Sequence, residues 1–232
     1  MRKLPVAMFG ILVFLVWSGC TRMIPDPVRS PPACEISYQG DLRPEDFRGI
    51  RLSPDYALDV AGKSSPNYEE ASARSAADLF SRFHELPLTK MPSCVSEAYR
   101  LTWVPSFHRT TTVRIWASED GYFITAKRLE RTAENRNGFA YTEAGRQISS
   151  ANWNEIRTAI GKFDFWNLPA NQNEALPNDG AAWLLEGWQN GRYHNVLRIS
   201  PDSEFERSIR AFFALTGEQT EIDLYLTAGS AK

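Results

Sequence analysis

The stretch AAWLLEGWQNGRYHNVLRI (residues 181–199) carries the clearest structural signal in the sequence. Asn190-Gly191 separates two runs of strand-forming residues, and Asn-Gly favours the type I′ turn of a two-residue β-hairpin. Both faces of this hairpin would mix apolar and polar side chains, so we expect both to be covered at least in part. The turn predicts four facing pairs: Trp188 with Tyr193, Gly187 with His194, Leu185 with Val196, and Trp183 with Arg198.

Three further strands are predicted upstream of this hairpin, at residues 97–104, 111–117 and 122–129. Asp120-Gly121 separates the last two and predicts a second hairpin. A two-residue loop there would pair Ala117 with Ile124 and Ile115 with Ala126. The opposite face would carry Arg114, Lys127, Trp116 and Phe123. Residues 130–148 are polar and contain two glycines, which predicts a loop.

Helical periodicity predicts three helices. The first spans residues 67–86, with Ser65-Pro66 at its start and Pro87 after it. The second begins at Ser149 or Ser150 and ends near Gly161, and we expect the aromatic segment 163–169 that follows to plug the core. The third begins at a capping box, Ser203-Glu204-Phe205-Glu206, and ends at Gly217. Together these elements predict an α+β fold, an antiparallel sheet of about five or six strands with two or three helices packed on it.

The N-terminus has the features of a bacterial export signal. Arg2 and Lys3 precede residues 4–17, which carry no charge and are too short to span a bilayer. Ser18-Gly19-Cys20 follows and resembles the cleavage box of bacterial lipoproteins, in which the cysteine is lipidated and becomes the new N-terminus. Trp17 stands where these proteins usually have leucine. The alternatives are an ordinary cleaved signal peptide or a short uncleaved anchor.

The rest of the chain fits a domain tethered to a membrane. We expect a lipoprotein signal peptide at 1–19, a proline-rich tether at 20–33, a single α+β domain at 34–217 and a C-terminal tail at 218–232. Two or more acyl chains on Cys20 would give a lasting membrane anchor. Thr21, in place of an aspartate after the cysteine, favours the outer membrane, with the domain facing the periplasm.

Cys34 and Cys94 remain as a pair if Cys20 carries lipid. In an oxidising cell envelope this pair predicts a disulfide. Two separate buried thiols and a metal site are the alternatives, and the absence of CxxC or HxxxH spacing argues against a metal.

Charge and motifs exclude several functions. Removal of residues 1–19 takes two basic residues with it and changes the net charge from −2 to −4, which gives no reason to expect nucleic-acid binding. The sequence has no glycine-rich phosphate loop, no GxSxG elbow and no HExxH. We therefore expect no cofactor and no resident metal.

Several motifs resemble those of a set of uncharacterised bacterial envelope proteins and lipoproteins. The motifs are DGAAWLLEG (179–187) followed by GRYH (191–194) and Ser200-Pro201, together with PSFH (105–108) and FWNLP (165–169). The resemblance covers roughly residues 96–216, and Ile199 stands where related sequences often have tryptophan. It implies an envelope location and this order of elements, but no chemistry.

Only one place in the sequence brings acid–base residues close together. His194 is predicted to lie opposite Gly187, near Glu186, Asp179 and Tyr193. An envelope hydrolase acting on cell-wall or glycan material would use Glu186 and His194, although a structural hydrogen-bond network under a half-buried sheet is the preferred explanation of these residues.

Aromatic side chains on the main hairpin suggest a different kind of site. Trp183, Trp188, Tyr193 and Arg198 could bind a sugar or peptide, or could simply pack in the core. The sequence favours a non-enzymatic envelope lipoprotein that binds a protein partner or has a structural role.

Overall fold

The computed structural model describes residues 34, 36, 42–47, 50, 66–131, 139–170, 180–199, 201–217 and 219–226. The chain divides into two units, Met1–Pro31 and Pro32–Lys232, and every described residue belongs to the second. The predicted signal peptide, Cys20 and the tether lie outside the described residues.

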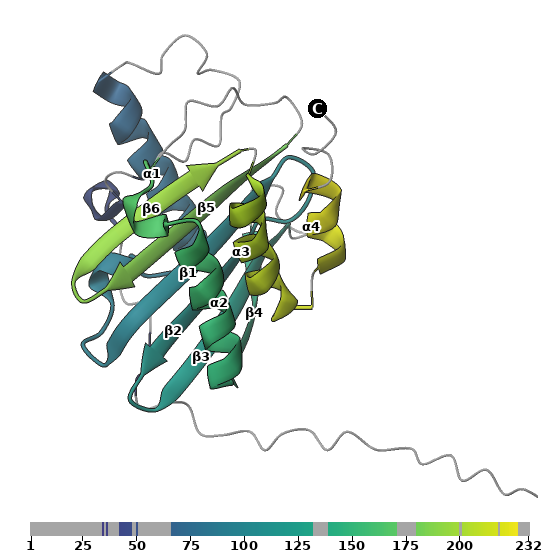
Figure 1. The fold of residues 1–232 in the computed structure, drawn as a ribbon. Coiled ribbons are helices and arrows are strands. Elements are labelled where there is room, and N and C mark those ends of the chain that lie inside the picture. Colours follow the sequence, from purple (N-terminus) through teal and green to yellow (C-terminus); the bar gives the residue numbers. More distant parts are fainter. Residues whose placement is uncertain are drawn as a thin grey trace, which may run out of the picture. The chain divides into compact units, whose positions relative to one another are not determined.

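The second unit is built on one six-stranded antiparallel sheet, as expected for the α+β class (Figure 1). The strand order is β4-β3-β2-β1-β5-β6. The strands are β1 (Val95–Pro105), β2 (Thr111–Ser118), β3 (Gly121–Arg131), β4 (Phe139–Ile148), β5 (Ala181–Gln189) and β6 (Arg192–Arg198).

The register of β5 with β6 is the predicted one, from Trp188 opposite Tyr193 to Trp183 opposite Arg198. The register of β2 with β3 differs from the prediction, because the two loop residues are Glu119 and Asp120. Gly121 instead opens β3 with a φ of +127°, which a glycine adopts readily. Each residue of β2 therefore has a partner two positions away from the predicted one, for example Ile115 opposite Ile124. A shift of two residues keeps the same side chains on each face.

The prediction of a loop over residues 130–148 is wrong, because β4 occupies Phe139–Ile148. β4 is the outermost strand, and the side chains of residues 142–147 are exposed on both of its faces. Where neither face of a strand is buried, as over residues 142–147, apolar and polar residues need not alternate, so this stretch lacks the usual strand signal.

Four α-helices and three short 3₁₀ helices complete the described part of the chain. The α-helices are α1 (Pro66–Arg82), α2 (Ser150–Lys162), α3 (Ser203–Ala214) and α4 (Gln219–Leu226). The 3₁₀ helices are η1 (Pro44–Phe47), η2 (Leu88–Lys90) and η3 (Phe165–Asn167).

Three helix ends differ from the prediction, among them the end of α3 at Ala214, three residues before Gly217. α1 stops at Arg82, four residues early, and His84 then adopts a positive φ of 49°. The N-cap of α3 is Asp202 rather than Ser203, since the Asp202 carboxylate accepts hydrogen bonds from the backbone N–H groups of Glu204 and Phe205 at 3.1 and 2.9 Å. The N-cap of α2 is Ser149, one of the two predicted candidates.

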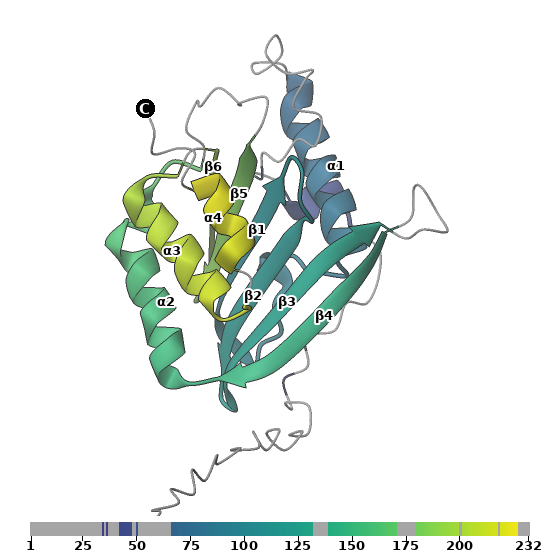
Figure 2. The same ribbon diagram turned by 90° about the vertical axis from the view of Figure 1, so that its right-hand side faces the viewer.

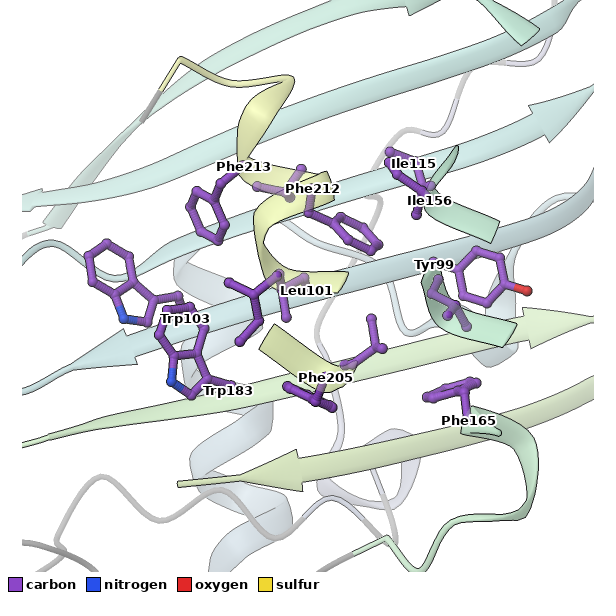
Figure 3. Close-up of a cluster of buried hydrophobic side chains, with 14 of the residues drawn as sticks. Tyr99, Leu101, Trp103, Ile115, Ile156, Phe165, Trp183, Phe205, Phe212 and Phe213 are labelled. Atoms are coloured by element: carbon purple, nitrogen blue, oxygen red, sulfur yellow. The ribbon is translucent and has the colours of Figure 1, made fainter. Parts of the chain in front are cut away.

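Helices α2, α3 and α4 cover one face of the sheet and enclose an aromatic core (Figures 2 and 3). Trp103 and Trp183 from neighbouring strands stack at 5.6 Å, and Phe213 of α3 meets Trp103 edge-on. Phe165 of η3 is fully buried in the same core, which confirms that the aromatic segment after α2 plugs it. Ile222 and Leu226 of α4 are buried there too, so residues 219–226, which lie in the predicted C-terminal tail, form a helix packed on this core.

The opposite face of the sheet is covered by α1, η1 and the segment that contains the disulfide. Phe47 and Phe80 stack at 5.2 Å against Leu184 of β5. Cys34 and Cys94 form the predicted disulfide, with Cα atoms 5.8 Å apart. In the chain-entropy model, closing a loop of this length stabilises the fold by about 4 kcal/mol.

Candidate functional site

The two residues predicted to act together as acid and base point to opposite faces of the sheet. Glu186 lies opposite Asn195, and His194 lies opposite Gly187. Neighbouring positions of a strand point to opposite sides, so Glu186 faces α1 whereas His194 faces η3. The two side chains therefore do not converge, which leaves the hydrolase alternative without its acid–base pair. Asp179, the third acidic candidate, lies outside the described residues.

His194 is packed among aromatic rings. Its ring centroid lies 5.0 Å from that of Phe165 and 6.3 Å from that of Trp166. Phe165 also fills the space above Gly187, since a Cβ atom there would lie 2.6 Å from the Phe165 ring. Burial lowers the pKa of His194, more than hydrogen bonds to the backbone of Leu168 and Phe165 raise it. His194 is consequently a neutral packing residue at physiological pH.

The aromatic residues of the hairpin do not form one surface. Trp183 and Arg198 are buried on the α3 side, and Trp183 stacks on Trp103. Trp188 and Tyr193 are half-buried on the other side, beside the disulfide. The hairpin therefore distributes its aromatic rings between two cores.

Trp116, Phe123, Arg114 and Lys127 do share one face, as the sequence predicted. All four side chains are buried. The two aromatic rings stack at 5.4 Å, and the Arg114 guanidinium lies 5.3 Å from the Trp116 ring centroid. The group forms part of an internal cluster and offers no open surface to a ligand.

The main concentration of charge in the described part of the chain is buried between the sheet and the end of α1. We call Glu85, Arg100, Arg114, Lys127 and Glu186 the ionic cluster, and all five side chains are buried. The Glu85 carboxylate lies 2.6 Å from Arg114 Nη1, 3.0 Å from Lys127 Nζ and 3.5 Å from Arg100 Nη1.

Glu186 belongs to this cluster rather than to an acid–base pair. Arg100 donates two parallel hydrogen bonds to the Glu186 carboxylate, at 2.6 and 2.7 Å. The Tyr193 hydroxyl donates a third at 3.0 Å. The Arg100 guanidinium also lies 3.8 Å from the centroid of the Phe80 ring of α1. Planar, bidentate pairing of this kind is the strongest form of arginine–carboxylate contact.

The ionic cluster also holds the chain where α1 ends. Lys127 Nζ donates to the backbone carbonyls of Phe83 and His84 at 3.1 and 3.0 Å, and Arg100 donates to that of Leu86 at 2.7 Å. Carbonyl groups after the last helical turn lack partners within the helix, so cationic side chains can satisfy them. Together with the bond from Arg114 of β2 to Glu85, these contacts anchor the segment that follows α1 to three strands of the sheet.

The electrostatics of the ionic cluster fix its protonation. Burial raises the pKa of the Glu85 carboxyl, but Arg114, Lys127 and Arg100 more than offset this and hold it below its ordinary value. Burial and the Glu186 carboxylate raise the pKa of Tyr193 well above its ordinary value. Glu85 therefore stays ionised and Tyr193 stays protonated near neutral pH, which suits these two groups to fixing α1 and not to proton transfer.

The sequence does not reveal the ionic cluster as a unit. Glu85 falls within the helix predicted over residues 67–86, and no local pattern marks it as buried. One signal was present, because Arg114 and Lys127 were expected on the same face of a hairpin. Two cations on a covered face require a buried anion, and Glu85 supplies it.

A second group that the sequence did not reveal lies where β1 ends. His108 Nδ1 and the Tyr225 hydroxyl of α4 are 2.7 Å apart, and the imidazole stacks on the buried Trp103. The side chain of Phe107, which precedes His108, is 73% exposed. No other large hydrophobic side chain among the described residues is exposed. The group joins the β1–β2 loop to α4, which the sequence analysis treated as tail.

The described residues contain no group of His, Cys, Asp and Glu side chains arranged to hold a metal ion. No helix within the described ranges is long and apolar enough to cross a membrane. No family model matches this chain, and no curated protein is detectably similar to it.

Proposed function

We propose that this chain is a bacterial envelope lipoprotein, anchored by lipid on Cys20, whose domain binds a protein partner or has a structural role. The observation that carries the proposal is Ser18-Gly19-Cys20 directly after the charge-free residues 4–17. The Cys34–Cys94 disulfide supports an oxidising location. It also leaves Cys20 as the one cysteine of the sequence outside that bond.

A non-enzymatic role is supported by the placement of the ionisable groups. Glu186 is held by Arg100 and Tyr193, and His194 is packed against Phe165 on the opposite face. This arrangement gives a hydrolase centred on Glu186 and His194 no geometric support. A ligand site on the hairpin has equally little, because its aromatic rings serve two separate cores.

The decisive experiment is metabolic labelling with an alkyne fatty acid, combined with membrane fractionation of cells that produce the full chain. The wild-type chain is expected to incorporate label and to sediment with membranes, whereas Cys20→Ala is expected to do neither. Globomycin, which inhibits lipoprotein signal peptidase, should cause the unprocessed form to accumulate. Cys94→Ser is the matched control, since it removes a different cysteine and should leave labelling unchanged.

Two results would contradict the proposal. Processing of Cys20→Ala at the wild-type rate would indicate an ordinary signal peptide. Membrane association without label or cleavage would indicate an uncleaved anchor.

A further inference from the structure

The two edges of the sheet differ in how they are covered. At the β6 edge, the backbone N–H of Leu197 donates to the carbonyl of Ala170 at 2.7 Å, and Arg192 donates to the carbonyl of Trp166 at 2.6 Å. The segment after α2 therefore covers that edge. β4 forms the other edge (Figure 2), and residues 142–147 expose their side chains on both faces.

The hydrogen-bond pattern shows which backbone groups of β4 point outward. Leu129 of β3 donates its N–H to the carbonyl that precedes β2, at 3.0 Å, so the odd-numbered residues of β3 bond to β2. The even-numbered residues bond to β4, which makes Ala126 and Ala144 a hydrogen-bonded pair. Alternation along β4 then directs the N–H and C=O groups of Glu143 and Gly145 away from the sheet.

Outward backbone groups on a regular edge strand are complementary to another strand. β4 contains no proline, and it pairs with β3 without a bulge along its whole length. Natural edge strands that avoid pairing use short length, bulges, proline or charged side chains. β4 has none of the first three devices, and its two exposed charges, Glu143 and Arg146, are of opposite sign.

We propose that β4 pairs antiparallel with β4 of a second copy, so that two sheets join edge to edge about a two-fold axis at Ala144. The outward N–H and C=O groups belong to odd-numbered residues of β4, so every hydrogen-bonded pair between the two copies must join two odd-numbered residues. The two-fold axis must therefore pass through a residue and not between two residues. An axis at Glu143 would oppose two like charges. An axis at Ala144 instead places Glu143 opposite Gly145 and Thr142 opposite Arg146, with small side chains at the centre.

The neighbouring position on the other side fits less well. An axis at Gly145 would place Thr142 of one copy opposite Ile148 of the other and extend the pairing into Ser149, the N-cap of α2. Ile148 is buried in the core of its own domain. The axis at Ala144 keeps the paired stretch within residues 141–147.

The contact is small, so it is expected to be weak between molecules in dilute solution. Confinement of many copies to one membrane would strengthen it, and only this consequence rests on the proposed lipidation.

Site-specific disulfide crosslinking tests the pairing. Two Ala144 positions across the axis would form a non-hydrogen-bonded pair with Cα atoms about 4.5 Å apart, within disulfide range. Two Thr142 positions would lie four residues apart along the strands, about 13 Å. Ala144→Cys is therefore expected to give a reducible dimer on mild oxidation of the purified full chain, and Thr142→Cys is not.

A second pair of variants blocks the edge itself. Gly145→Pro removes one outward N–H from each copy and leaves the pairing of β4 with β3 in place. Gly145→Ala is the matched control, because a Cβ at this position would meet its nearest neighbour, Thr125 Oγ1, at an ordinary 3.5 Å. In the Ala144→Cys background, the proline is expected to reduce dimer yield by about tenfold or more. The alanine should leave the yield unchanged.

Equal crosslinking of Thr142→Cys and Ala144→Cys would overturn the proposal, and so would equal yields from the proline and alanine variants. Circular dichroism verifies that Gly145→Pro is folded. If it is not, the comparison of Ala144→Cys with Thr142→Cys still decides. All crosslinking variants carry Cys20→Ser, because Cys20 without lipid would be a free thiol that could itself crosslink. In this background the outcome does not depend on whether Cys20 carries lipid.

Discussion

Replacement of Glu85 by glutamine removes the central negative charge of the ionic cluster while it preserves the shape of the side chain. Glu85 is 0% exposed and lies within 3.5 Å of three cationic groups. The variant would leave Arg100, Arg114 and Lys127 buried with Glu186 as their one fully buried carboxylate. Removing one partner from a buried ion pair costs about 3–5 kcal/mol.

A loss of this size is large enough to measure. In a domain of this length, each kcal/mol lowers Tm by about 2–4 °C, so Glu85→Gln should lower Tm by roughly 6–20 °C. Urea unfolding of the purified protein with its disulfide intact would give the free energy directly. The control is Glu143→Gln, whose carboxylate is 3.9 Å from Lys127 but 45% exposed. This exposed pair should contribute less than about 1 kcal/mol.

The pH dependence gives an independent test with a defined sign. The pKa of Glu85 is lower in the folded protein than its ordinary value of 4.5. Its contribution is therefore fully present above about pH 5 and is lost as the pH falls through the lowered pKa. The difference in unfolding free energy between wild type and Glu85→Gln should be constant from pH 6 to 8 and should shrink below pH 4.5.

Two results would refute this account of the cluster. One is a Glu85→Gln variant that loses no more stability than Glu143→Gln. The other is a second replacement, Arg114→Met, that fails to restore stability to Glu85→Gln, since it removes an uncompensated cation whose hydrogen bond was to Glu85.

Three further predictions concern packing, capping and the disulfide. Gly187→Ala should destabilise by about 1–3 kcal/mol, because its Cβ would lie 2.6 Å from an aromatic ring, whereas Gly161→Ala, which meets nothing within 4 Å, should not destabilise. Asp202→Ala should cost about 1 kcal/mol as the loss of an N-cap, and Ser203→Ala should cost much less if Asp202 is the cap. Cys94→Ser should lower the unfolding free energy by roughly 2–5 kcal/mol, measured against wild type under oxidising conditions.

The sequence predicts best those elements whose turn residues, capping residues or spacing of buried apolar side chains are characteristic of the structure. Residues 181–199 combine an Asn-Gly turn with strand-forming residues, so the sequence predicts both strands and the register in which they pair. The helix α2 has a capping serine and buried apolar positions at helical spacing. The Cys34–Cys94 disulfide is predictable because Cys20, the third cysteine, belongs to the predicted export signal.

The errors have physical causes. β4 lies at an edge and buries little, so its sequence carries no alternating pattern. The Asp-Gly dipeptide suggested the right hairpin but not which residues form its loop, because Gly121 can also open a strand at positive φ. α4 is short, and its helical signal rests on the two buried positions Ile222 and Leu226.

The candidate site could be predicted less well, since ion pairs between distant segments leave no local pattern. Glu85 and Glu186 are separated by about a hundred residues, and their contacts depend on how α1 crosses the sheet. Periodicity placed Arg114 and Lys127 on one face, but it could not show which carboxylate faces them. The separation of Glu186 from His194 was predictable, because the register of the hairpin already assigned them to opposite faces.

The surfaces of the domain that no other element covers indicate where a partner could bind. The α2–α4 face is filled by aromatic side chains, the α1 face by the ionic cluster, and the β6 edge by the segment that ends at Ala170. Within the described ranges this leaves the β4 edge and the loop that exposes Phe107. The first offers backbone hydrogen bonds and the second an apolar side chain, supported by the contact between His108 and Tyr225. A partner that binds at this loop would use Phe107 as an aromatic anchor, so Phe107→Ala should weaken such binding without changing the crosslinking at Ala144 on the β4 edge.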